Sequence, residues 1–218
     1  MDTQRPVDRP RYIAVEGPIG VGKTALAKLL AGRLGARLLV EPSDANPFLA
    51  AFYADRKKHA FQTQLFFLLS RFKHQEALSQ QDLFSRSIVS DHLFARDRIY
   101  AALTLSADEL SMYERVYELL GPRVVKPDLV VYLQARQEVL VQRARRAGRP
   151  HVDPAWVGEV AKAYGEFFFH WEETPLLVVN TSDIDLEGEA QDQEDLLAVI
   201  RKHRKGTQHY VPMGTKSG

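Results

Sequence analysis

The sequence has no cysteine, which excludes disulfide bonds and thiolate metal sites. It also has no apolar run near the length of about 18 to 20 residues that spans a bilayer, and no internal repeat. Its first residues, Met1 to Arg11, are polar and include prolines, unlike the apolar core of a secretory signal. These absences predict a cytoplasmic protein that does not contact a membrane.

An excess of charge of one sign is missing as well. The chain has 29 Lys and Arg against 28 Asp and Glu, which leaves a formal net charge of +1. Without a global field to attract a polyanion, we expect no nucleic acid partner. Any phosphate site must therefore be local.

The length of 218 residues suits one large α/β domain and is short for two. We assign residues 1–204 to this domain. Residues 205–218 contain glycine and proline and lack an apolar period, so we expect a flexible tail there.

Short apolar runs alternate with longer helical patterns along the chain. This alternation predicts an α/β fold of three layers, in which helices flank a parallel five-stranded sheet. The expected strands are Tyr12–Val15, Leu38–Val40, Ile88–Val89, Leu129–Leu133 and Leu176–Val179. The expected helices are Lys23–Leu34 (closed by Gly35), His59–Leu78, Phe94–Leu120 with a break near Ser106, Gln137–Ala147, Pro154–Trp171 and Gln193–His203.

A phosphate-binding loop follows the first strand. Gly17, Gly22, Lys23 and Thr24 complete the pattern G-x-x-x-x-G-K-T, with Gly20 inside it, between an apolar strand and a helix-forming segment. Backbone N–H groups and the helix N-terminus would bind phosphate, Lys23 would reach the β- and γ-phosphates, and Thr24 would bind Mg²⁺. The loop predicts ATP binding but does not identify the acceptor.

The segment after the second strand points to an acceptor. Glu41-Pro42 followed by Asn46-Pro47 resembles the E-P-x-x-x-N-P segment of the deoxyribonucleoside kinases. The resemblance implies a P-loop kinase fold with an arginine-rich lid, and implies that Glu41 is the general base for the nucleoside 5′-hydroxyl. A carboxylate at the carboxyl end of a parallel strand also suits the usual place of an α/β active site.

The long helix resembles the family helix that reads the base with a Gln and, two turns later, an Arg. Gln64 and Arg71 have that separation and fall on one stripe with Phe61 and Leu68. An amide and a guanidinium would then line an otherwise apolar site, where a planar base could bind.

Pro127-Asp128-Leu129 with Tyr132-Leu133 resembles the family strand that precedes the lid, and the lid is expected at about residues 143–153. By resemblance, Arg143 and Arg146 clamp the transferring phosphoryl group and Arg149 binds the donor.

Two features depart from the family pattern in this region. Ala147 stands where the family has Arg, and the segment His151-Val152-Asp153 lacks the Glu-Gln pair expected there. The family Glu helps to hold the sugar 3′-hydroxyl, so discrimination between deoxyribose and ribose stays open. Tyr53 is our candidate for contacting the sugar instead.

The third strand allows two registers of the family motif D/E-R-S and its later Asp. In the first, Ser85-Arg86-Ser87 is the motif and Asp91 is the later Asp. In the second, Asp91 is the acid that ligates Mg²⁺ with Thr24, Asp97 is the later, base-facing Asp, and Arg96 supplies the charge that His92 lacks. We favour the second, because it leaves Ile88-Val89 for a buried strand.

The sequence thus predicts a homodimeric enzyme that transfers the γ-phosphate of ATP to the 5′-hydroxyl of a 2′-deoxyribonucleoside. We expect a base with an exocyclic amine, because a carboxylate accepts amine protons. A nucleoside-monophosphate kinase of the thymidylate type and a nucleotide-binding subunit without catalysis are the alternatives.

Overall fold

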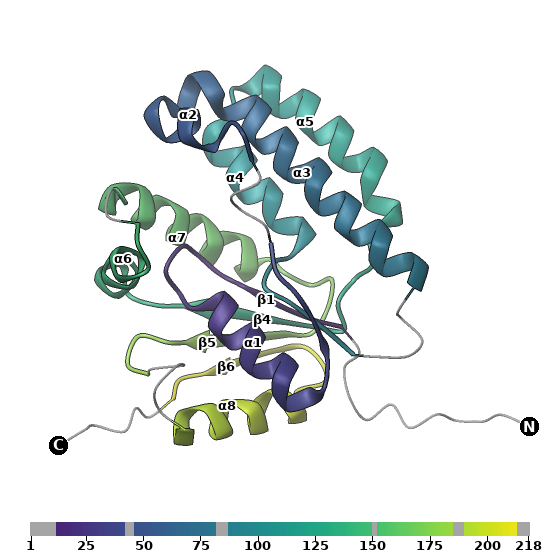
Figure 1. The fold of residues 1–218 in the computed structure, drawn as a ribbon, viewed down its shortest axis with the longest axis vertical. Helices are drawn as coiled ribbons and strands as arrows, with labels where there is room; N and C mark the ends of the chain where they lie inside the picture. Colours follow the sequence, from purple (N-terminus) through teal and green to yellow (C-terminus); the bar gives the residue numbers. More distant parts are fainter. Residues whose placement is uncertain (1–11, 42–45, 82–86, 150–151, 185–189, 213–218) are drawn as a thin grey trace, which may run out of the picture.

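The computed structural model describes residues 12–41, 46–81, 87–149, 152–184 and 190–212. A parallel sheet of six strands runs through its centre, in the order β2-β3-β1-β4-β5-β6 (Figure 1). The strands are β1 (Tyr12–Glu16), β2 (Arg37–Leu39), β3 (Ile88–Ser90), β4 (Leu129–Gln134), β5 (Leu176–Asn180) and β6 (Thr207–Tyr210).

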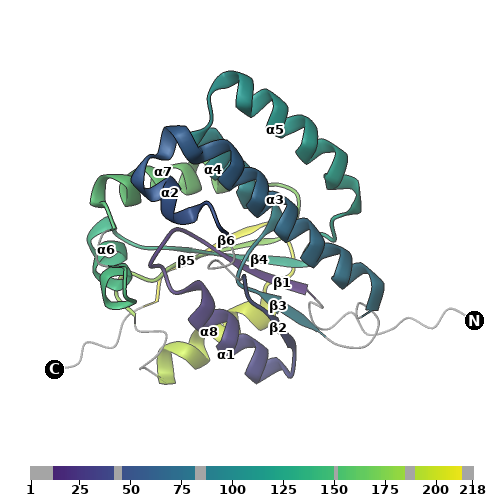
Figure 2. The same ribbon diagram turned by 45° about the horizontal axis from the view of Figure 1, so that its top comes forward.

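Helices cover both faces of the sheet, as Figure 2 shows most clearly for α1 and α8 on one face and α3 and α4 on the other. The helices match the predicted ones to within a few residues, except for the short helix α2. They are α1 (Lys23–Leu34), α2 (Leu49–Ala54), α3 (Arg56–Gln81), α4 (Asp97–Thr104), α5 (Ala107–Leu120), α6 (Gln137–Arg146), α7 (Pro154–Phe169) and α8 (Ala190–Lys202), with short 3₁₀ turns η2 (Phe94–Arg96) and η3 (Gly121–Arg123).

The side chains of β1 point alternately to the two faces of the sheet and pack into two apolar cores. Ile13 and Val15 pack into the apolar core that α1 and α8 cover, whereas Tyr12 and Ala14 pack into the core beneath α4 and α7. This alternation follows from the two-residue period of a strand. It places the next residue, Glu16, on the α4 and α7 face, where it is fully buried.

The predicted break near Ser106 separates α4 from α5. Ser106 begins α5 with a capping box, in which its side chain accepts a hydrogen bond from the backbone N–H of Glu109 and the Glu109 carboxylate accepts one from the backbone N–H of Ser106. The break lets α4 and α5 follow different directions over the sheet.

Two predictions about the fold are corrected. The sheet has a sixth strand, because Thr207–Tyr210 pairs in parallel with β5, so this part of the expected tail is an ordered edge strand. Its polar sequence concealed it, since an exposed edge strand needs little apolar pattern. The short helix α2 was not predicted either.

Within the described ranges, no helix is both long and apolar enough to cross a membrane.

Candidate active site

Three adjacent strands deliver the predicted catalytic residues to one edge of the sheet. The carboxyl end of β1 leads into the P-loop, that of β2 leads to Glu41, and that of β3 leads to Asp91. The strand order β2-β3-β1 makes these ends neighbours, as expected for the binding edge of a parallel sheet.

Two positions in the P-loop need glycine for different contacts. Gly17 and Gly20 both have positive φ, at 152° and 82°, and a Cβ atom at either would collide with backbone. The obstacle is the carbonyl of Leu133 on β4 for Gly17, and the carbonyl of Leu140 on α6 for Gly20. Gly20 therefore allows the loop to lie against the helix that leads into the lid. Gly22, also at positive φ, directly precedes α1.

Lys23 folds back onto this loop. Its Nζ donates hydrogen bonds to the carbonyl oxygens of Gly17 at 2.7 Å and Pro18 at 3.2 Å. Burial lowers the pKa of the Lys23 ammonium to about 8, although the carboxylate of Glu16 opposes this shift. An incoming phosphate would offer the ammonium a stronger acceptor than either carbonyl.

Asp91 connects the P-loop to the end of β2. Its Oδ2 accepts a hydrogen bond from the hydroxyl of Thr24 at 2.6 Å, and its Oδ1 accepts one from the backbone N–H of Glu41 at 2.9 Å. Burial opposes ionisation of this carboxyl, but hydrogen bonds from His92, Thr24 and the Glu41 N–H outweigh it and hold its pKa below the ordinary value. One carboxylate thus fixes the relative positions of the phosphate loop and Glu41.

The Glu41 side chain lies between two buried guanidinium groups. It forms ion pairs with Arg71 from α3 and with Arg96 from η2. Burial raises the pKa of the Glu41 carboxyl, but Arg96 and Arg71 outweigh it and hold the pKa well below its ordinary value. Glu41 is therefore ionised.

Arg71 also pairs with Asp97 at the start of α4. The same guanidinium thus contacts Glu41 and Asp97. Asp97 is 1% exposed, and its Oδ2 has no hydrogen-bond partner among the described residues. This oxygen can accept a hydrogen bond from a ligand.

Sequence reasoning missed Glu16, which completes this network. Its Oε1 accepts from the Gly17 N–H at 2.9 Å and the Tyr164 hydroxyl at 3.0 Å, and its Oε2 accepts from the Leu93 N–H at 2.8 Å. Arg96 lies 3.5 Å away. An acid at the end of an apolar strand, directly before the P-loop glycine, was the available signal.

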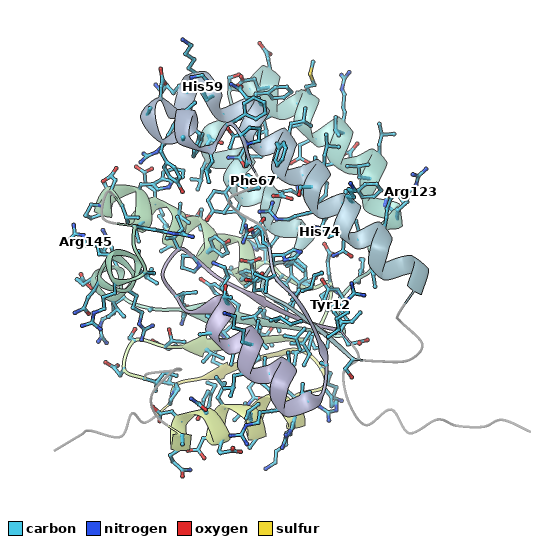
Figure 3. The ribbon with its side chains drawn as sticks, in the orientation of Figure 1. Tyr12, His59, Phe67, His74, Arg123 and Arg145 are labelled. Atoms are coloured by element: carbon cyan, nitrogen blue, oxygen red, sulfur yellow. The ribbon has the colours of Figure 1, made fainter. Side chains whose placement is uncertain are left out.

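Gln64 is buried on α3 and donates from Nε2 to the hydroxyl of Thr104 at 3.3 Å. Gln64 and Arg71 lie on one stripe of α3, as predicted, and each contacts a residue of α4. Their role in binding the base stays a prediction. Figure 3 shows His74, further along α3, on the side that faces the strands. Tyr53 on α2 is about half exposed and, among the described residues, forms no hydrogen bond or ion pair with this network, so its role stays a prediction.

The lid arginines lie apart from the network of Glu41. Arg143 on α6 donates to the carbonyl oxygens of Thr181 and Ile184, both at 2.7 to 2.8 Å, and so supports the loop after β5. Arg146 and Arg149 are exposed, and their side chains form no ion pair with other described residues. Figure 3 shows the neighbouring Arg145 pointing away from the sheet. The predicted clamp on the phosphoryl group therefore needs the lid to move.

The structure places Asp91 directly after β3, as the second register requires. Arg96 forms an ion pair with Glu41, and Asp97 forms one with Arg71 of α3. The metal-binding role of Asp91 and the base-facing role of Asp97 stay predictions. Ser85 and Arg86 of the first register, and His151 in the lid, lie outside the described residues.

The fold and this edge of the sheet define a P-loop kinase, with a phosphate loop and a strand-end carboxylate beside it. Comparison with family models matches residues 13–205 to the deoxynucleoside kinases. The chain belongs to the deoxynucleoside kinase family.

Individual relatives agree with this assignment. The chain is 33% identical over 179 residues to the deoxyguanosine kinase of Bacillus subtilis (strain 168), covering 80% of this chain and 86% of that one. It is 29% identical over 203 residues to the deoxyadenosine/deoxycytidine kinase of the same organism, covering 89% and 93%. A solved structure of the deoxyadenosine kinase from M. mycoides with bound dATP matches the fold with a TM-score of 0.71 at 24% identity, covering 86% of this chain and 97% of that one.

The protein is therefore a phosphotransferase that phosphorylates deoxyribonucleosides with ATP as the donor. This confirms the predicted family, fold class and reaction.

We expect Lys23→Ala to lower turnover at least about a hundredfold, because it removes a positive charge from the transferring phosphates in a site that acts by electrostatic stabilisation. Steady-state assays with ATP and a deoxynucleoside measure the effect. Lys28→Ala, which changes an exposed lysine on the same helix, is the control and should stay near normal. Near-normal turnover of Lys23→Ala would refute the role assigned to the loop.

Proposed function

We propose that Glu41 is the general base that accepts the proton of the nucleoside 5′-hydroxyl. As the proton passes to Glu41, the 5′-oxygen forms a bond to the γ-phosphorus of ATP, and the bond from that phosphorus to the β–γ bridging oxygen breaks, which releases ADP. The observation that carries this proposal is the hydrogen bond from the Glu41 N–H to Asp91, whose other oxygen accepts from Thr24 of the P-loop. It holds the carboxylate beside the phosphate loop.

The arginines around Glu41 suit this role, although they make it a weak base. Arg71 and Arg96 keep its carboxylate ionised and ready to accept a hydrogen bond from the hydroxyl. In a loose phosphoryl-transfer transition state the hydroxyl becomes acidic only as its bond to phosphorus forms. The proton can therefore leave late, when a weak base suffices.

Mg²⁺ fits Thr24 and Asp91. Among the described residues no group of three or more His, Asp or Glu side chains could hold a metal by itself. Mg²⁺ in kinases needs only one or two protein oxygens, with phosphate and water completing its shell. The Thr24 hydroxyl and the Asp91 carboxylate, 2.6 Å apart, supply such a pair. When bound, the ion neutralises charge on the β- and γ-phosphates.

Base recognition is proposed for Gln64, Arg71 and Asp97. The free Oδ2 of Asp97 favours a base that presents an exocyclic amine. We propose a purine as the better substrate, which agrees with the relatives named deoxyguanosine and deoxyadenosine kinases.

The remaining predicted contacts require closure around the substrates. We propose that Arg146 and Arg149 turn onto the phosphates of ATP, while Arg143 supports the adjacent loop. Tyr53 is proposed to contact the sugar. We also propose that the enzyme acts in the cytoplasm.

Glu41→Gln tests the base directly. The amide keeps the shape of the carboxylate but cannot accept a proton, so turnover should fall at least about a hundredfold. Titration calorimetry should still detect binding of ATP and nucleoside. Glu138→Gln, at an exposed carboxylate on α6, is the matched control. An effect confined to KM would make Glu41 a binding residue only.

Asp91→Asn and Asp97→Asn form a crossed test of the two acidic positions. The first should lower turnover with every nucleoside alike and raise the Mg²⁺ requirement, because Asp91 faces Thr24. The second should change the preference among four deoxynucleosides and leave the Mg²⁺ dependence alone, because Asp97 faces Arg71. The reverse pattern would exchange the two roles.

We propose that the enzyme is a homodimer that buries the outer face of α3 and α5, two helices that lie side by side in Figures 1 and 2. Leu69 on α3 is 48% exposed, and Met112 and Leu119 on α5 are 59% and 76% exposed. Exposed apolar side chains on two adjacent helices favour a protein interface. Light scattering should give twice the mass of one chain, and Leu119→Asp should halve it. Phe169→Asp, an exposed apolar position on α7, should not; a monomeric wild type contradicts the proposal.

A further inference from the structure

The amide of Gln64 is held by a residue that no part of the proposed mechanism uses. Gln64 is 3% exposed, and its Nε2 donates to the hydroxyl oxygen of Thr104 at 3.3 Å. Thr104 stands at the last position of α4 and donates from the same hydroxyl to the carbonyl oxygen of Tyr100 at 2.7 Å. The two hydrogen bonds form a chain from the end of α4 to the proposed base-reading side chain.

This chain fixes the direction of the amide. A threonine hydroxyl has one proton, and in Thr104 that proton is used on Tyr100. Toward Gln64 the hydroxyl can then only accept, so the NH₂ of the amide must face it. Turning the amide over would oppose two oxygens or would break the bond to Tyr100.

The fixed direction determines what Gln64 offers to a ligand. Its Oε1 and the second hydrogen of Nε2 stay available, since no hydrogen bond to another described residue uses them. Gln64 therefore presents one hydrogen-bond acceptor and one donor to a ligand, and their relative positions are fixed.

A Gln64 amide with fixed donor and acceptor positions distinguishes two kinds of purine base. Adenine presents an amine donor next to a ring-nitrogen acceptor, and hypoxanthine presents the reverse, a carbonyl acceptor next to a ring N–H donor. A freely rotating amide can pair with both patterns by turning over, whereas a fixed amide matches one.

We propose that Thr104 is a positioning residue for base selection: it restricts Gln64 to one amide orientation and so makes the enzyme discriminate between 6-amino and 6-oxo purines. This inference rests on the proposed role of Gln64 as a base reader.

The test compares deoxyadenosine with deoxyinosine, which differ only at this edge of the purine. The ratio of their kcat/KM values is measured for the wild type, Thr104→Val and Thr104→Ser. The valine keeps the shape but not the hydroxyl, so the ratio should move about tenfold toward one, while serine should retain the wild-type ratio. A wild-type ratio within twofold of one, or an unchanged ratio in a folded Thr104→Val, would overturn the proposal. If Thr104→Val loses its thermal unfolding transition, Thr104→Ala is measured in its place under the same criteria.

A second pair of variants tests the positioning role of Thr104 separately from the base-reading role of Gln64. Gln64→Ala should bring the ratio toward one, and adding Thr104→Val to it should change the ratio no further. If Gln64→Ala leaves the ratio unchanged, the base-reading role of Gln64 fails. If Gln64→Ala changes the ratio and Thr104→Val does not, only the role of Thr104 fails. If Thr104→Val changes the ratio equally in the wild type and in Gln64→Ala, the positioning role of Thr104 also fails.

Discussion

The site depends on one buried charge network in which Glu16, Glu41 and Asp97 are paired with Arg71 and Arg96. Removing one partner of a buried ion pair costs about 3–5 kcal/mol, because the other charge stays buried without compensation. The five side chains come from β1, the end of β2, α3, η2 and α4, so they meet only when α3 and α4 are packed on the sheet. The charged active site therefore forms only in the correctly folded protein. Through Arg71, the network also links Glu41, the proposed general base, to Asp97, which is proposed to recognise the nucleobase of the substrate.

Asp91 performs the complementary task on the phosphate side. A hydroxyl from α1 and a backbone N–H from the end of β2 share its two oxygens. Since β2, β3 and β1 are neighbours, three short connections suffice to bring the phosphate loop, the strand-end carboxylate and Glu41 together. The parallel sheet supplies this proximity, because all its strands end at the same edge. The lid, which follows β4, stands further along that edge, and this explains why its exposed arginines do not contact the network.

Most of the fold was predictable because the apolar period of an element, and the glycines that mark turns and helix ends, can be read from neighbouring residues in the sequence. α1 matches its predicted bounds, from the P-loop lysine to the residue before Gly35, and the α4–α5 break falls at the expected Ser106. Glu41, Asp91 and Asp97 were predicted from their resemblance to motifs of the deoxynucleoside kinases, and the strand ends before Glu41 and Asp91 supported the choice. β6 was not, because an exposed polar edge strand is defined by its partner β5 rather than by its own pattern. Glu16, Thr104 and the contacts of Arg143 escaped prediction for the same reason, since their partners lie far away in sequence.

The central claim is that this network holds Glu41 where it can take the proton of the acceptor hydroxyl. A structure of the enzyme with ADP and a deoxynucleoside tests it most directly, through the distance from the Glu41 carboxylate to the 5′-oxygen. The account predicts a hydrogen-bond distance of about 2.6–3.2 Å, with the edge of the base toward Gln64 and Asp97. A 5′-oxygen that lies against Asp91 or His92, with Glu41 still enclosed by Arg71 and Arg96 and out of its reach, would contradict the account.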